Sequence, residues 1–267
     1  MAEEVLLAII RAELSQFRRE MQEASAIVQR TSQHSTQSMG TLTSAIGAAR
    51  AGLAALGVSV GVAGVVALGK QAVDSARQME GFTLSLKNAQ GSLAAAQHSL
   101  AFVRQEADRL GLDVQKATRQ FVSLPNATRG TSLEGEATRN LFVGLSEASR
   151  TLGLNTDQYG RALLAVSQIA LKGKVQQEEL LQLAEAGISV QKALADSRGK
   201  TTQELAKMLE QGQVGREALV GLGEALRKDF GQGAVEGAQL AQASFARLGN
   251  EVQALGASVG KGLLSAF

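Results

Sequence analysis

The spacing closest to a ligand-binding motif is Gly64-Val-Val-Ala-Leu-Gly69-Lys70, which has the Gly-x-x-x-x-Gly-Lys order of phosphate-binding loops. Such loops hold phosphate oxygens on backbone N–H groups, and a Ser or Thr after the lysine binds the magnesium ion. Here Gln71 follows Lys70, and no alternating strand pattern or acidic partner comes after it. The motif is incomplete, so the sequence predicts no nucleotide site.

Cysteine and histidine, which bind metals or take part in nucleophilic catalysis, are almost absent. The chain has no cysteine, which excludes disulfides and cysteine-based zinc sites, and its two histidines, His34 and His98, stand far apart. Neither histidine has a carboxylate cluster around it, so both are predicted to be surface residues of helices. No paired-carboxylate, Cys/His or His-Glu-x-x-His arrangement occurs. We therefore predict no catalytic, cofactor-binding or metal-binding residue, no cofactor, and no enzymatic activity.

The composition indicates an all-α protein built from small side chains. Of 267 residues, 45% are hydrophobic but only 3% aromatic, with one proline, one tyrosine and no tryptophan. Ala-rich and Leu-rich faces favour helices that pack closely in pairs. The 27 basic and 25 acidic side chains are intermixed and leave a net charge of only +2. Because no basic block is present, sequence-specific nucleic-acid binding is not expected.

The first predicted region, residues 1–45, is a heptad helix followed by a polar linker. Apolar residues recur at alternating spacings of three and four, as in a coiled coil or helical bundle: Leu7, Ile10, Leu14, Phe17, Met21, Ala24 and Val28. The partner is either a second chain or the rest of the same chain. Residues 29–44 are rich in Ser, Thr and Gln, which weakens the helix.

The second region, residues 46–72, is rich in glycine and alanine and contains 19 uncharged residues at 51–69. As a helix these 19 residues would be about 28 Å long, close to the thickness of the hydrocarbon core of a membrane. Gly57 and Gly61 form a Gly-x-x-x-Gly pair that allows two helices to approach closely. Two interpretations remain open for this segment, a transmembrane helix or a buried helical hairpin.

The third region, residues 73–230, is predicted to be a compact domain of short helices. Each predicted helix ends at a glycine or proline and is followed by a residue that can cap the next helix. Four helices are predicted in the first part: 92–110, ended by Gly111; Asp113 to about Leu124, ended by Pro125-Asn126; about 132–152, ended by Gly153; and Asn155 or Thr156 to Leu171. A short helix with Glu178 and Glu179 in its first turn follows. A capping box at Thr201–Glu204 starts the next helix, and a helix over about 216–230 closes the domain.

Two short patterns occur twice in this domain. Residues 111–119 (GLDVQKATR) resemble residues 153–161 (GLNTDQYGR) at an offset of 42, and residues 173–180 (GKVQQEEL) resemble residues 212–219 (GQVGREAL) at an offset of 39. Two copies of each are fewer than a solenoid needs. The patterns indicate reuse of a helix-turn-helix arrangement.

The fourth region, residues 231–267, is predicted to be a C-terminal amphipathic helix. Its heptad is nearly uncharged and runs through Ala238, Ala241, Phe245, Leu248, Val252, Leu255 and Val259. Such a helix needs a partner or a membrane surface to cover its apolar face. Together with the N-terminal heptad it suggests self-association.

The middle of the chain resembles the N-terminal domain of tape measure proteins from tailed bacteriophages. Residues 168–183 (QIALKGKVQQEELLQL) match a characteristic run of that family, and residues 199–205 (GKTTQEL) and 212–214 (GQV) match the segments that follow it. The usual proline after the first run is replaced here by Ile188-Ser189. A coiled coil and a Gly/Ala-rich apolar segment ahead of this domain are also typical of the family.

This resemblance implies a structural protein of the virion tail lumen that templates the length of the tail tube and takes part in genome delivery. It implies the tail tube protein, tail assembly chaperones and tail tip or baseplate proteins as partners, the host cytoplasm as the place of assembly, and the host inner membrane as a destination during infection. A fully helical chain of 267 residues would reach about 400 Å, and a compact domain in its middle would make it shorter. We therefore expect either a protein that measures a very short tail or the N-terminal part of a longer protein. The alternative is a membrane-active or pore-forming helical protein.

Overall fold

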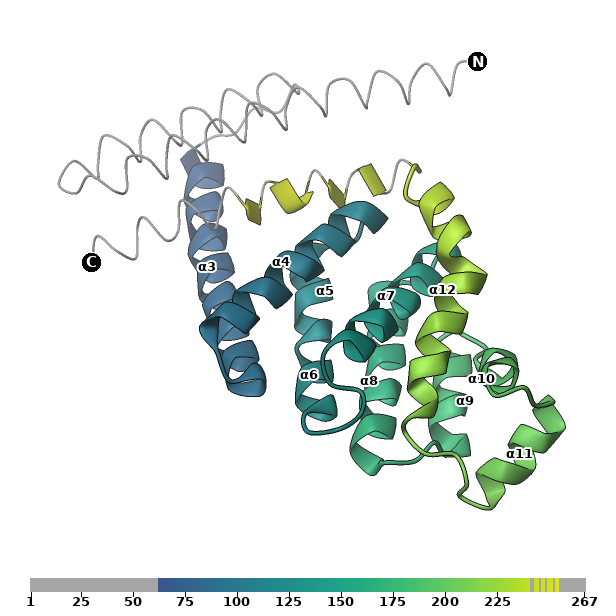
Figure 1. Ribbon diagram of the computed structural model, residues 1–267. Helices are drawn as coiled ribbons and strands as arrows, with labels where there is room; N and C mark the ends of the chain where they lie inside the picture. Colours follow the sequence, from purple (N-terminus) through teal and green to yellow (C-terminus); the bar gives the residue numbers. More distant parts are fainter. Residues whose placement is uncertain (1–61, 241–242, 245, 248, 252, 255–267) are drawn as a thin grey trace, which may run out of the picture. The chain divides into compact units, whose positions relative to one another are not determined.

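The computed structural model describes residues 62–240, 243–244, 246–247, 249–251 and 253–254, and all of the elements named in it are helices (Figure 1). They are α3 (Val62–Gln90), α4 (Leu93–Leu110), α5 (Val114–Phe121), α6 (Ser123–Thr128), α7 (Glu136–Thr151), α8 (Thr156–Lys172), α9 (Gln177–Glu185), α10 (Gln191–Ser197), α11 (Thr202–Glu210) and α12 (Ala218–Gly237). Over these residues the extended pairing consists of one isolated antiparallel bridge, Lys174 with Gly215. The all-α prediction is confirmed.

The chain divides into two compact units, of which one, Phe82–Ala243, is described except at residues 241 and 242. Helix α3 passes the predicted boundary at residue 72, and α12 continues to Gly237, beyond the predicted end at residue 230. The predicted N-terminal heptad region 1–45 lies outside the described residues. So does most of the C-terminal heptad.

The predicted membrane-spanning segment gains no support from the structure. Its last eight residues, 62–69, are helical and belong to α3, whereas residues 51–61 lie outside the described part of the chain. Among the residues that are described, no helix combines the length and the apolar content needed to cross a bilayer.

The offset-42 repeat is a helix joint that the fold uses twice. Gly111 and Gly153 both adopt the left-handed conformation, with φ of 64° and 65°. The next residue, a leucine in both cases, donates its N–H to the carbonyl five residues back, at 2.8 Å in the first joint and 3.0 Å in the second. Asp113 and Asn155 then cap the following helices with their side chains, as predicted. Each joint is thus encoded by three adjacent residues, Gly-Leu-Asp at 111–113 and Gly-Leu-Asn at 153–155.

Two predicted details of this region are wrong. The helix that begins after Asp113 ends at Phe121, and Pro125 does not break it but lies in the first turn of α6. Proline is tolerated there because the first N–H groups of a helix have no partner within the helix. Leu152, whose place in the apolar pattern of the predicted helix 132–152 puts it on the core side, is instead 43% exposed, because α7 ends at Thr151 and Leu152 is its C-cap.

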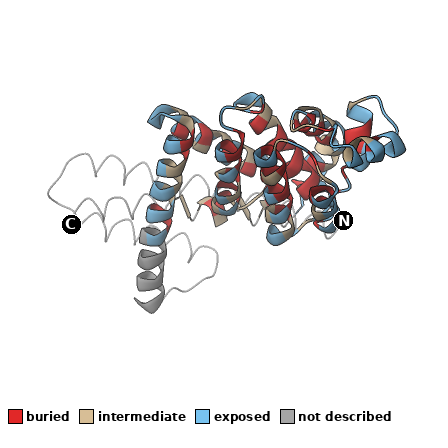
Figure 2. Ribbon diagram, turned by 90° about the horizontal axis from the view of Figure 1, so that it is seen from below, coloured by how far each residue is buried: buried red, intermediate tan, exposed pale blue. Residues whose placement is uncertain are grey.

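The core of the compact unit lies between the helices, where Figure 2 shows buried residues on facing sides of the ribbon. Four aromatic rings meet at its centre. The ring of Phe142 on α7 lies 5.0 Å from that of Phe121, 6.0 Å from Phe102 and 6.4 Å from Tyr159, measured between centroids. This cluster joins α4, α5, α7 and α8.

Helices α7 and α12 approach closely because glycine faces glycine where they cross. A Cβ atom added to Gly144 would lie 2.7 Å from the carbonyl oxygen of Gly223, and one added to Gly223 would lie 3.1 Å from Cα of Leu141. Real Cβ contacts of 2.7 Å do not occur, so position 144 needs glycine for this crossing, and a Cβ atom at position 223 would require its neighbours to shift by a few tenths of an ångström. Residues nearly 80 positions apart in sequence thus form one interface.

Candidate functional site: paired glycine turns and buried carboxylates

The segments of the offset-39 repeat lie beside each other. The N–H of Val175 donates to the carbonyl of Val214 at 2.8 Å, and the N–H of Arg216 donates to the carbonyl of Gly173 at 3.1 Å. Val175 and Val214, which occupy equivalent positions in the two repeats, are 1% and 0% exposed. The two repeats therefore pair with each other across one bridge, which the sequence pattern alone did not indicate. We call residues 173–176 and 212–216 the turn pair.

Glycine is required on one side of the turn pair. Gly173 ends α8 with φ of 79°, and a Cβ atom at this position would lie 2.5 Å from a guanidinium nitrogen of Arg216. That guanidinium donates to the carbonyl of Ala170 at 2.5 Å. Its positive charge thus satisfies a free carbonyl at the negative end of the α8 dipole. Arg216, which follows Ala170 by 46 positions in the sequence, thus caps the C-terminus of α8.

A buried carboxylate anchors the same segment of the turn pair, residues 173–176. Glu179 is fully buried, binds Nζ of Lys172 at 2.5 Å, and accepts the N–H of Gln176 at 3.2 Å in a capping box. Its hydrogen bond to Lys172 raises the pKa of that lysine. Sequence analysis placed Glu178 and Glu179 together in the first turn of α9, but their environments differ, since the side chain of Glu178 is 70% exposed.

These neighbours give a direct test of the buried carboxylate. Glu179→Ala is expected to lower the free energy of unfolding by about 1–3 kcal/mol, because both a charge-assisted hydrogen bond and a helix cap are lost. Glu178→Ala removes an equal charge one residue earlier and should change it by less than about 0.5 kcal/mol. Urea unfolding followed by circular dichroism measures both. Equal losses for the two variants would show that burial of Glu179 is unimportant.

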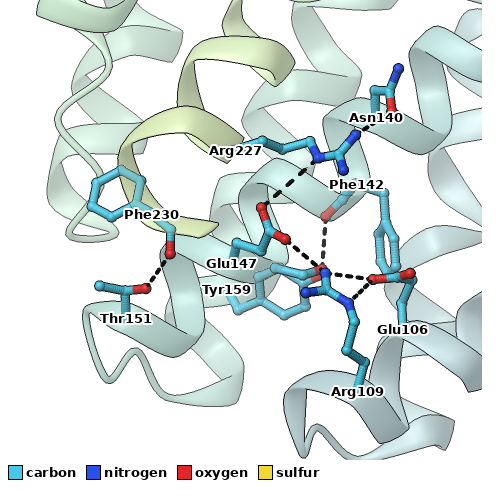
Figure 3. Close-up of polar contacts among 10 residues, drawn as sticks. Glu106, Arg109, Asn140, Phe142, Glu147, Thr151, Tyr159, Arg227 and Phe230 are labelled. Carbon is cyan, nitrogen blue, oxygen red and sulfur yellow. Dashed lines mark hydrogen bonds and ion pairs between the residues drawn. The ribbon is translucent and has the colours of Figure 1, made fainter. Parts of the chain in front are cut away.

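A second buried carboxylate, Glu147, links three helices (Figure 3). Its Oε1 lies 2.7 Å from Nη2 of Arg109 on α4, and its Oε2 lies 4.0 Å from Nε of Arg227 on α12. Arg109 also binds Glu106 at 2.8 Å, and Arg227 donates to Asn140 at 2.9 Å. Oε2 of Glu147 is buried without a hydrogen-bond partner among the described residues.

The single tyrosine is a packing residue. The hydroxyl of Ser146 donates to the carbonyl of Phe142 at 2.7 Å, so the hydroxyl of Tyr159 donates to Ser146, at 2.5 Å. Burial raises the pKa of Tyr159. A tyrosine held protonated and hydrogen-bonded in the core serves to position α8 against α7.

The other residues singled out in the sequence fall where local chemistry places them. His98 is an exposed residue of α4, as predicted, whereas His34 lies outside the described residues. The capping box at Thr201 and Glu204 is present, and hydrogen bonds from the backbone and side chain of Thr201 lower the pKa of Glu204. Across the described residues, no group of three histidine, cysteine or acidic side chains is arranged to hold a metal ion.

Comparison with known proteins identifies the family to which this sequence is similar. A sequence model described as "Tape measure protein" matches residues 70–261. The chain is also 27% identical over 122 residues to the "Probable tape measure protein" of Salmonella phage Felix O1 (isolate Felix O1-VT1). That match covers 45% of this chain and 16% of the relative, so the chain corresponds to a small part of the relative's length. No solved structure matches it.

Proposed function

The chain belongs to the tape measure protein family, and on this premise we propose that it acts in a phage tail as a structural component that sets the length of the tail tube. The match of the family model to residues 70–261 carries the proposal. The turn pair supports it, because residues that resemble the family motif join the end of α8 and the start of α9 to the segment that precedes α12.

The proposed role is structural because the distinctive residues serve packing. Gly173, Val175 and Glu179 are held by contacts within the fold. We infer that the compact unit acts as a folded block and that the heptads predicted on either side of it supply the extended parts. We propose that those heptads associate with other copies and that the tail tube protein, assembly chaperones and tail tip proteins are the partners.

A change in the length of the predicted N-terminal heptad tests this function. Inserting a second copy of residues 1–28 after Val28, in frame in the phage gene, should lengthen the tail by about 42 Å, since each helical residue adds about 1.5 Å. Tail lengths are measured by electron microscopy of purified particles.

The control is an insertion of the same size at an exposed turn of the compact unit. Twenty-eight Gly and Ser residues placed after Gly199, between α10 and α11, form a surface loop and do not lengthen the predicted heptad helix. This insertion should leave the tail length unchanged. Normal tail length in the first variant would contradict the measuring role.

We further propose that the protein takes part in genome delivery and is located in the tail until infection. The uncharged composition of residues 51–69 is the observation that favours a role at the host envelope. A liposome flotation assay of the purified chain tests the envelope step. Failure to float with vesicles would remove it while leaving the length-setting role intact.

A further inference from the structure

The second half of α12 has a composition that does not favour a helix. Glycines occupy positions 231, 233 and 237, and each lowers the helix-forming tendency about fivefold relative to alanine. The first half of the same helix buries three leucines, Leu219, Leu222 and Leu226. Residues 231–240 bury only two small side chains, Ala234 and Ala238, and leave Val235 and Leu240 52% and 60% exposed. The two halves are therefore held by very different amounts of apolar burial.

The surface of α7 beneath this second half is polar. The hydroxyl of Thr151 donates to the carbonyl of Phe230 at 2.9 Å, and Thr151 also lies against Gly233. The side-chain stem of Arg150 lies against Gly237, and the carboxylate of Glu147 faces Gly231. Figure 3 shows Thr151 and Glu147 on the side of α7 that faces α12. Water can replace the hydrogen bond from Thr151, and it would supply the hydrogen bond that Oε2 of Glu147 lacks. The contacts at Gly233 and Gly237 are with the methyl group of Thr151 and the methylene groups of Arg150, so little apolar area is buried there.

The segment has one further anchor at its end. Ala243 is fully buried and packs on Gly111, the left-handed glycine of the first helix joint. A Cβ atom at Gly111 would lie 2.3 Å from that of Ala243, so this anchor exists only because residue 111 is glycine. The equivalent Gly153 in the second joint has nothing within 4 Å of its Cβ position.

We propose that residues 231–240, anchored at their end by Ala243, form a detachable strap. In the closed state the strap is helical over 231–237, lies on α7 and seats Ala243 on Gly111. In the open state it unwinds as one unit while the rest of the compact unit stays folded, and the first half of α12 stays docked through its leucines.

Hydrogen exchange of the full chain, read by mass spectrometry, tests the strap. Amides of residues 232–240 should exchange at least about 100-fold faster than those of 220–226, although both lie in or directly after the same helix. Gly231→Ala should slow exchange of the strap about fivefold, because the added methyl group would lie 3.5 Å from its nearest neighbour and helix formation improves. Equal protection of both halves of α12 would overturn the proposal.

The two helix joints provide the matched control. Gly111→Ala and Gly153→Ala place alanine at nearly the same φ, so they strain the backbone equally. Only Gly111→Ala dislodges Ala243, so it should make the strap exchange about tenfold faster than in the unchanged protein. Gly153→Ala should leave the exchange rate of the strap unchanged. Ala243→Gly, which removes the anchoring methyl without straining a joint, should also speed exchange. Identical strap exchange in all three variants would show that Ala243 does not hold the strap.

Discussion

Phe142→Ala is expected to lower the free energy of unfolding of the compact unit by about 3–5 kcal/mol. The side chain is fully buried, and its ring contacts three other aromatic rings from three helices. Removing it deletes this apolar burial and leaves a cavity that the surrounding helices cannot close. The loss should be the largest of any single truncation considered for this chain.

The measurement can use the protein's own fluorescence. Tyr159 is the single tyrosine, and the chain has no tryptophan, so emission reports on the compact unit. Leu164→Ala is the control, since this leucine of α8 is 53% exposed and its truncation should cost less than about 0.5 kcal/mol. If Phe142→Ala unfolds the chain outright, Phe142→Leu should give a smaller, measurable loss. A cost below about 1.5 kcal/mol for Phe142→Ala would contradict the aromatic core.

Gly144→Val is expected to cost at least about 3 kcal/mol, near the upper end of the range for overpacked cores. Even the first added atom would lie 2.7 Å from the carbonyl oxygen of Gly223 and 3.0 Å from Cβ of Leu226. Because the nearest obstacle is backbone, the two helices would have to separate, and the leucines of α12 would lose their contacts. Gly144→Ala should show the same effect to a lesser degree.

A second glycine of this helix pair separates steric clash from other effects. Gly231→Ala also adds a methyl group between α12 and α7, but its nearest neighbour is 3.5 Å away. This variant should retain or raise stability, since alanine favours the helix by up to about 1 kcal/mol. Thermal unfolding followed by circular dichroism compares the two. Equal destabilisation by Gly144→Ala and Gly231→Ala would mean that the crossing at Gly144 is not the constraint.

The high helix content and most helix ends follow from local sequence patterns. Asp113, Asn155 and Thr201 cap helices, and Gly111, Gly153 and Gly173 end them, because each acts on backbone groups within a few residues. Such interactions can be predicted from residues that are adjacent in the sequence. The family resemblance likewise rested on short runs, and the match over residues 70–261 agrees with it.

Only the tertiary structure decided which helices meet. The pairing of α7 with α12 depends on Gly144 and Gly223, and the turn pair depends on Val175 and Val214. Each pair is distant in sequence, and many helix arrangements are compatible with the same caps. The structure also separated Glu179, which is buried, from the exposed Glu178 beside it. Burial is a property of the assembled helices, so no local pattern could distinguish these two carboxylates.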